Sequence, residues 1–162
     1  MTFLKVVKSA VAAALMALAI PAGLTPALAR VEAGRPQTGL KVVPLTITTG
    51  KRQHRFKVEV AASEEQQATG MMFRRRIGPS EGMLFPFRTP RPAWFWMKNT
   101  LIPLDMIFIR PDGTIARIAA NVPPLTLDNV GIGEPMAAVL EIGGGRAAAL
   151  GIREGDRVSW RG

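Results

Sequence analysis

Apolar and polar residues alternate in short runs along most of the chain from residue 40 onward. Phe56, Val58 and Val60 alternate with Lys57 and Glu59, a period of two that is typical of a strand with one buried face. Turn residues separate this run from similar ones. We expect further strands at residues 40–48, 82–87, 93–98, 104–110, 114–119, 136–142 and 157–160.

Turn and proline signals constrain how these strands are arranged. The Pro-Asp-Gly sequence at residues 111–113 predicts a tight hairpin between the two strands on either side of it. Pro44 has no N–H to donate, which indicates that the first strand lies at an edge of the sheet. Residues 121–135 are rich in Pro and Gly and predict a loop. The strand at 136–142 is apolar on both faces, which is typical of a central strand.

Helical signals are few. Ser63 is followed three residues later by Gln66, the spacing of a capping box, and Gly70 can end that helix after about two turns. Residues 146–150 allow one or two further helical turns, closed by Gly151. Many short strands with one or two small helices predict a mainly β domain, folded as an antiparallel sandwich or barrel.

The N-terminal segment has the composition of a secretory signal. Lys5 and Lys8 precede an apolar run at residues 11–20, and Ala27-Leu28-Ala29 has the small-x-small pattern that a signal peptidase recognises. The apolar run is shorter than the roughly 20 residues that a membrane-spanning helix needs. We therefore expect cleavage after Ala29 and a periplasmic or secreted protein.

This boundary divides the chain into three parts. Residues 1–29 are the expected signal peptide, residues 30–39 a flexible leader, and residues 40–162 a single β domain. The chain of 162 residues is 48% hydrophobic, which suffices for one domain with its own core. There is no Cys and a single His, so disulfides, thiolate metal sites and histidine clusters are excluded. We expect no metal and no cofactor.

The charge of the protein is strongly positive. The whole chain carries a net +9, and its first 29 residues contribute two lysines and no acid, so the remainder carries +7. An exported protein rarely meets nucleic acid, and we expect no nucleic-acid partner. The simplest interpretation is a solvated basic surface, and the alternatives are weak contact with an anionic membrane surface or with acidic glycans.

Six short motifs along the chain together form one recognisable pattern. They are Thr-Gly-Met-Met-Phe-Arg at 69–74, Gly-Met-Leu-Phe at 82–85, Phe-Trp-Met-Lys-Asn-Thr at 95–100, Ile-Pro-Leu-Asp-Met at 102–106, Val-Leu-Glu at 139–141 and Gly-Asp at 155–156. This pattern resembles family 192 of the domains of unknown function, over residues 56–158. The resemblance implies an antiparallel, jelly-roll-like β domain that is often exported, and it implies no established activity. Met71 stands where Leu is usual, an exchange that conserves volume.

Strand parity places three candidate ligand-binding residues on one face. Trp94, Trp96 and Lys98 share that face, and the residues between them point the other way. Two tryptophans in line with a lysine can form a stacking platform for a sugar or another flat ligand. The usual burial of tryptophan favours the alternative, in which both indoles belong to the core and Lys98 extends from the strand end.

Two acids lie in apolar strands. Asp105 and Glu141 must each be paired, hydrogen-bonded or held neutral with a raised pKa. Together they would suit general acid–base or glycosidase chemistry. Alternatively, each is a structural lock tied to backbone N–H groups, to Arg74 or to Lys98. We predict a structural role for Asp105, and a ligand-facing position for Lys98 with Asn99 nearby.

Three further sequence patterns indicate a structural role rather than a catalytic or ligand-binding role. His54 begins a strand and is expected at the surface, with no Ser in a Gly-x-Ser-x-Gly turn to act with it. Residues 143–148 fit Gly-x-Gly-x-x-Ala but lack the βαβ unit of a dinucleotide site, so we expect a turn with at most weak anion binding. Five methionines lie among Leu, Ile and Phe, which favours core filling over copper binding: Met71, Met72, Met83, Met97 and Met106.

Two classes of function follow. The first is a small periplasmic module that binds a small molecule, a glycan or an envelope protein. The second is a small periplasmic hydrolase or lyase that uses Asp105 and Glu141 as an acid/base pair, within about 10 Å of each other in an open cleft. The first is favoured over an enzyme, because no nucleophile–base pair and no metal-ligand set can be assembled. The candidate ligand-binding residues are Arg74, Trp96, Lys98, Asn99, Asp105 and Glu141.

Overall fold

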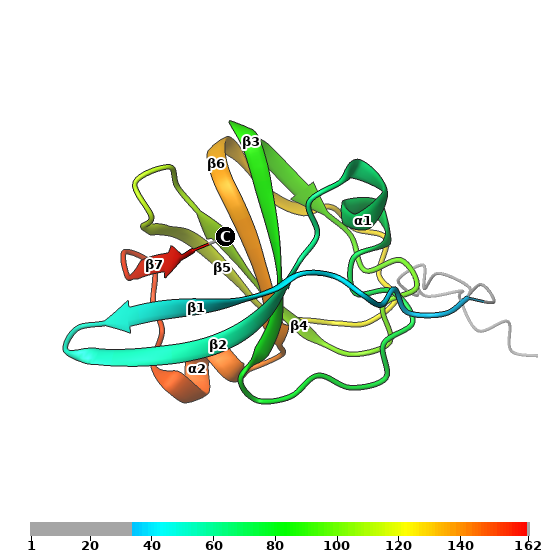
Figure 1. Cartoon of the computed structure of the whole chain (residues 1–162), viewed down its shortest axis with the longest axis horizontal. Coiled ribbons are helices and arrows are strands. Elements are labelled where there is room, and N and C mark those ends of the chain that lie inside the picture. The colour runs from blue at the N-terminus through cyan, green and yellow to red at the C-terminus, as the bar shows by residue number, and fades with distance from the viewer. Residues whose placement is uncertain (1–33, 162) are drawn as a thin grey trace, which may run out of the picture.

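The computed structural model describes residues 34–161, so the expected signal peptide and its cleavage site lie outside the described residues. In this part of the chain, seven strands form one curled sheet in the order β5-β4-β6-β3-β2-β1-β7 (Figure 1). The strands are β1 (Val42–Thr49), β2 (Arg52–Val60), β3 (Glu81–Phe95), β4 (Leu104–Ile109), β5 (Ile115–Val122), β6 (Val130–Gly143) and β7 (Arg157–Trp160), and the helices are α1 (Glu64–Thr69) and α2 (Arg146–Leu150). The predicted mainly β fold with two short helices is confirmed, in its barrel-like rather than its sandwich form.

Strand pairing is antiparallel except between two neighbours. β2 and β3 run parallel, with Lys57 opposite Glu81 and Val60 opposite Leu84. A parallel pair needs a crossover, and the segment between the two strands supplies it, with α1 on the way. The fully antiparallel sheet expected from the short turns is therefore wrong at this one pair.

The two edges of the sheet meet. Thr114, just before β5, forms an isolated antiparallel bridge with Arg157 at the start of β7. The N–H of Ile115 donates to the carbonyl of Asp156 at 2.8 Å, and the N–H of Val158 donates to the carbonyl of Gly113 at 2.8 Å. The sheet thus curls far enough for its first and last strands to share hydrogen bonds.

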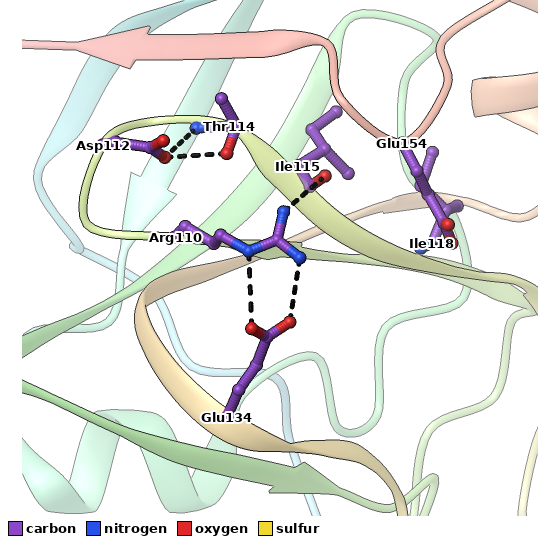
Figure 2. Close-up of polar contacts among 7 residues, drawn as sticks. All are labelled: Arg110, Asp112, Thr114, Ile115, Ile118, Glu134 and Glu154. Carbon is purple, nitrogen blue, oxygen red and sulfur yellow. Dashed lines mark hydrogen bonds and ion pairs between the residues drawn. The ribbon is translucent and has the colours of Figure 1, made fainter.

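The β4–β5 hairpin that makes this closure is held by side chains (Figure 2). The carboxylate of Asp112 accepts hydrogen bonds from the N–H and the hydroxyl of Thr114, at 2.9 and 2.7 Å. The guanidinium of Arg110 spans from the Ile115 carbonyl to Glu134 of β6, with an Nη2 to Oε1 distance of 2.9 Å. The hairpin predicted from Pro-Asp-Gly is confirmed.

Buried apolar residues form two cores, one on each face of the sheet. The inner core lies inside the curl, and the outer core lies between the convex face of β3, β4, β5 and β6 and the segments that cover it. The larger members of the inner core are Leu45, Ile47, Phe56, Val58, Leu84, Ile107, Ile109, Leu140, Ile142 and Val158. Those of the outer core are Met71, Met83, Phe85, Met97, Leu104, Met106, Phe108, Met136 and Val139.

The two long strands differ from the prediction. β3 is continuous where we expected two strands, and it is interrupted only by register shifts between Pro86 and Ala93. β6 begins inside the predicted Pro/Gly loop. Gly131 is what allows this, because a Cβ there would lie 2.2 Å from the carbonyl oxygen of Ala93 on the paired strand. The central position of β6, between β4 and β3, is confirmed.

α1 begins with the predicted capping box, in which the Ser63 hydroxyl accepts from the Gln66 N–H and the Gln66 side chain accepts from the Ser63 N–H. β1 is not an edge strand, since it lies between β2 and β7. β7 pairs only with residues 45–48, however, so β1 has β2 as its single neighbour at Pro44. No helix within residues 34–161 is long and apolar enough to cross a membrane.

Candidate functional site

Glu141 is a buried acid on the outer side of the sheet. It lies on β6 with Met83 of β3 and Met106 of β4 directly opposite, and only 4% of its surface is exposed. Burial raises the pKa of its carboxyl to about 8, against the opposing effect of the positive charge of Arg74. At neutral pH the carboxyl is therefore protonated, and it can both donate and accept hydrogen bonds.

A cavity of about 190 Å³ reaches this carboxyl from the surface, and we call it the Glu141 cavity. The end of α1 forms one wall, with Gln67. The far end of β3 and the turn after it form the other, with Trp94, Trp96, Lys98 and Thr100. The structure therefore brings together three of the predicted site residues: Trp96, Lys98 and Glu141.

The two tryptophans are surface residues. Trp94 is 59% exposed and Trp96 is 49% exposed, so the expectation that both indoles belong to the core is wrong. They share a face, as parity predicts, but it is the residues of the other parity, Ala93 and Met97, that belong to the outer core. The Lys98 ammonium lies 5.8 Å from the centre of the Trp96 ring, within cation–π range.

Asn99 has a structural position beside the cavity. It is buried and has a φ of 56°, a left-handed conformation that Asn tolerates better than most residues. Its carbonyl accepts from the N–H of Phe73 at 2.8 Å, and its amide contacts the Met72 sulfur at 3.9 Å. Asn99 therefore fixes the turn after β3, while its neighbour Thr100, which was not among the predicted site residues, lines the cavity.

Arg74 does not line the Glu141 cavity. Its guanidinium forms an ion pair with Glu59 of β2 at 2.5 Å and donates to the carbonyl of Gln37 at 3.3 Å. Arg74 instead lines two neighbouring hollows, one beside Glu81 and one beside Pro36. Its influence on the site is electrostatic, through the pKa of Glu141.

Asp105 points to the other side of the sheet. Asp105 lies opposite Ile142, and its neighbour Met106 lies opposite Glu141. Because successive residues of a strand face opposite ways, the two acids face opposite sides of the sheet, and Asp105 belongs to no ligand site with Glu141. The acid/base pair required by the hydrolase alternative is not formed.

The structural role predicted for Asp105 follows from its hydrogen bonds. Its carboxylate is fully buried and accepts from the backbone N–H groups of Asn121, Gly145 and Ala147, at 2.7, 2.8 and 2.7 Å. Its partners are thus backbone groups and not Arg74 or Lys98. The glycine-rich segment before α2 forms a turn, as predicted. The anion that lies at the start of α2 is the Asp105 carboxylate itself.

Two remaining predictions concern His54 and the methionines. His54 is half-buried rather than a surface residue, because it has the same strand parity as Phe56 of the inner core. Core filling is confirmed for Met71, Met83, Met97 and Met106, and Met72 is half-buried. Within residues 34–161, no group of three or more His, Cys, Asp or Glu side chains is arranged to hold a metal ion.

Comparison with known proteins agrees with the fold. The family model described as DUF192, "Uncharacterized ACR, COG1430", matches residues 45–160, which confirms the resemblance seen in the sequence motifs. No curated protein matches.

Two solved structures are similar over most of the chain. A protein of unknown function from Novosphingobium aromaticivorans DSM 12444 is 46% identical, with a TM-score of 0.75, covering 84% of this chain and 97% of that one. A protein of Sinorhizobium meliloti 1021, described as a proposed transcription regulator, is 39% identical, with a TM-score of 0.74, covering 76% of this chain and 97% of that one.

Proposed function

This chain belongs to the DUF192 family, and we propose that it is an exported module that binds one sugar unit in the Glu141 cavity. The family description names no activity, so the proposal rests on the cavity itself. The observation that carries it is a buried carboxyl group in the lining of a small cavity that two exposed indoles also line.

The size and chemistry of the cavity suit a sugar. Its volume of about 190 Å³ is below the roughly 300–1,000 Å³ of sites for drug-sized ligands, so it suits a single small unit. A protonated carboxyl can donate to one hydroxyl group and accept from another. Thr100 adds a hydroxyl, and Gln67 adds only its amide oxygen, because its NH₂ group donates to the carbonyls of Ala61 and Pro86. The faces of Trp94 and Trp96 can pack against the C–H face of a sugar ring.

Charge at the rim narrows the ligand class. Arg91 and Lys98 both line the Glu141 cavity, and the acid within it is uncharged at neutral pH. A cationic ligand would meet repulsion at the rim and no carboxylate inside. The cavity therefore favours a neutral or acidic sugar over an amino sugar with a free ammonium group.

The signal-like segment supports a location outside the cytoplasm. Lys5, Lys8, the apolar run and Ala29 have the order of a secretory signal. Glycans of the cell envelope are the sugars that an exported protein meets. For the same reason, we do not extend to this chain the regulatory role described for the Sinorhizobium protein.

Binding is favoured over hydrolysis because, among residues 34–161, the lining of the Glu141 cavity contains no second acid. Glycosidases hold two carboxyl groups about 5–10 Å apart in one cleft. Here Asp105 lies on the opposite side of the sheet, with all three of its described hydrogen bonds coming from backbone N–H groups.

Saturation-transfer NMR with glucose, N-acetylglucosamine, glucuronate and glucosamine tests the proposal. We expect binding of neutral or acidic sugars, a loss of about tenfold or more in affinity for Trp96→Ala, and no change for Val42→Ala, an exposed apolar control. Glu141→Gln should keep binding at pH 7, because it preserves an uncharged donor and acceptor, while Glu141→Leu should lose it. The proposal is wrong if no sugar binds, or if Trp96→Ala binds as the wild type does.

A further inference from the structure

The convex face of β2, β1 and β7 is the part of the sheet that the outer core leaves uncovered. The described buried residues of the outer core come from β3 to β6 and their connections, and none from these three strands. In this region Phe56, Leu45 and Val158 point into the inner core. Their neighbours along each strand therefore point outward to solvent.

Cations occupy three outward positions on the two flanking strands, which they share with Gln53, Glu59 and Ser159. Arg55 and Lys57 on β2 are exposed, as is Arg157 on β7, and Lys51 and Arg52 extend the group at the β1–β2 turn. We propose that this face, which we call the basic face, binds the surface of an anionic phospholipid bilayer.

The carboxylates nearest to the basic face have other partners. Glu59 is paired with Arg74 at 2.5 Å, and Glu81 accepts from the N–H of Gly78 at 2.8 Å. Asp112 accepts from Thr114, and Asp156 accepts from the hydroxyl of Thr49 at 2.8 Å. The described ion pairs join none of the basic-face cations to these four acids, and Arg157 is the one that lies near enough to Asp112 to contribute to the lowering of its pKa.

The shape of the basic face fits a plane. β1 lies between β2 and β7 in the sheet (Figure 1). Its outward residues are short: Pro44 lies opposite Lys57, Thr46 opposite Arg55, and Thr48 opposite Arg157. Arg55 and Lys57 can extend past these short residues to a flat surface, with their apolar stems spread along the protein, and Arg157 adds its charge from the other flank.

This spread favours a bilayer over a thread-like polymer. β2 and β7 flank β1 at about 10 Å from each other, which is two strand spacings. The cations therefore cover an area rather than a single line that one polyanion chain would follow. A surface of anionic headgroups attracts each nearby Lys or Arg, and contact strengthens with every cation that reaches it.

The basic face is independent of the proposed sugar site. The described lining of the Glu141 cavity contains no residue of β1, β2 or β7. Variants of Arg55 and Lys57 should leave sugar binding unchanged, so the failure of one proposal is distinguishable from the failure of the other.

Vesicle co-sedimentation tests the inference. The full chain is expressed, and purified protein is mixed with phosphatidylcholine vesicles with or without phosphatidylglycerol. We expect binding only to the anionic vesicles and a fall with added salt, because the Debye length shrinks to about 8 Å at physiological ionic strength. Arg55→Ala/Lys57→Ala should lower the partition coefficient roughly 25-fold, about fivefold per cation. Arg157 is kept, because it also donates to the Asp112 carbonyl at 2.8 Å.

The matched control removes the same charge elsewhere. Arg75→Ala/Arg88→Ala changes two exposed cations outside the basic face and should retain most of the binding. Arg55→Lys/Lys57→Arg should bind as the wild type does. Equal losses in the two alanine pairs would show that net charge alone matters, and would overturn the inference. So would retention of duplex DNA or of an acidic polysaccharide at a salt concentration that releases the vesicles.

Discussion

The buried carboxylate of Asp105 accepts a hydrogen bond of 2.7 Å from the backbone N–H of Ala147, 42 residues further along the chain. The same carboxylate holds the N–H of Gly145 before α2 and the N–H of Asn121 at the end of β5. One side chain therefore joins β4, β5 and the start of α2. Three backbone donors depend on it, and the N–H of Ala147, which is buried, would otherwise have no partner.

Asp105→Asn should destabilise the protein by roughly 3 kcal/mol. An amide has one oxygen, so one backbone N–H must face the NH₂ group, and the charge-assisted character of all three bonds is lost. Thermal or urea unfolding measures the effect. The control is Asp128→Asn, an exposed acid at which the same change should leave the free energy of unfolding nearly unaltered.

Glu141 should make the protein less stable as pH rises. Its pKa is about 8 in the folded protein and near 4.3 in an unfolded chain. Between these values the folded state binds one more proton than the unfolded state, so its stabilising effect is complete below about pH 4 and is lost as pH rises through 8. The free energy of unfolding should fall by about 1.4 kcal/mol per pH unit from this group between pH 5 and 8.

Glu141→Gln isolates that contribution. Glutamine is uncharged at every pH, so the difference in stability between wild type and variant should change across this window and level off above pH 8. Urea titrations of both proteins from pH 5 to 9 measure it. A constant difference would show that the Glu141 carboxyl is ionised throughout the range.

Truncation of aromatic residues around the Glu141 cavity should separate binding from stability. Trp96 is half exposed, so Trp96→Ala should change the free energy of unfolding by less than about 1 kcal/mol. Phe85 is buried, and its ring packs edge-on against the Phe95 ring with 5.1 Å between the ring centres. Phe85→Ala should therefore lower the free energy of unfolding by roughly 3–5 kcal/mol. Similar melting temperatures for the two variants would contradict the assignment of Trp96 to the surface.

The α1 capping box should have a measurable but small effect. Ser63→Ala removes the acceptor of the Gln66 N–H and should lower stability by about 1 kcal/mol. Ser159→Ala, at an exposed outward position on β7, is the matched control and should change stability little. Chemical unfolding of the two variants side by side decides whether the cap stabilises the fold.

Export has a direct test in mass spectrometry. If residues 1–29 are a cleaved signal, periplasmic protein should begin at Arg30. Intact-mass analysis of a periplasmic extract measures this. A full-length mass, or protein confined to the cytoplasm, would contradict the proposed location.

Local signals predicted the short elements well. The capping box at Ser63, the Pro-Asp-Gly hairpin and the last strand at residues 157–160 all depend on neighbouring residues, and the structure contains each of them. Such features need only the side chains within a turn or two, which the sequence displays directly.

The same local signals do not predict how strands that are distant in the sequence are aligned with one another. Parity shows which residues of one strand share a face, but it does not show the register between strands. For that reason the opposite orientations of Asp105 and Glu141 could not be read from the sequence. The exposure of Trp94 and Trp96 was missed for a related reason, since whether a face is covered depends on segments such as α1 that pack there from elsewhere in the chain.

The pairing of β7 with β1 also determines when the fold can be completed. Leu45 lies opposite Trp160, so nearly the whole domain separates the two partners along the chain. Contacts of such long sequence separation carry a large loop-closure entropy and slow the folding of β proteins. Until residues 157–160 are in place, β1 keeps an open edge at residues 45–48, the kind of edge to which other chains can add. β7 therefore covers this edge, and a chain that is still being synthesised keeps the edge open until residues 157–160 have emerged.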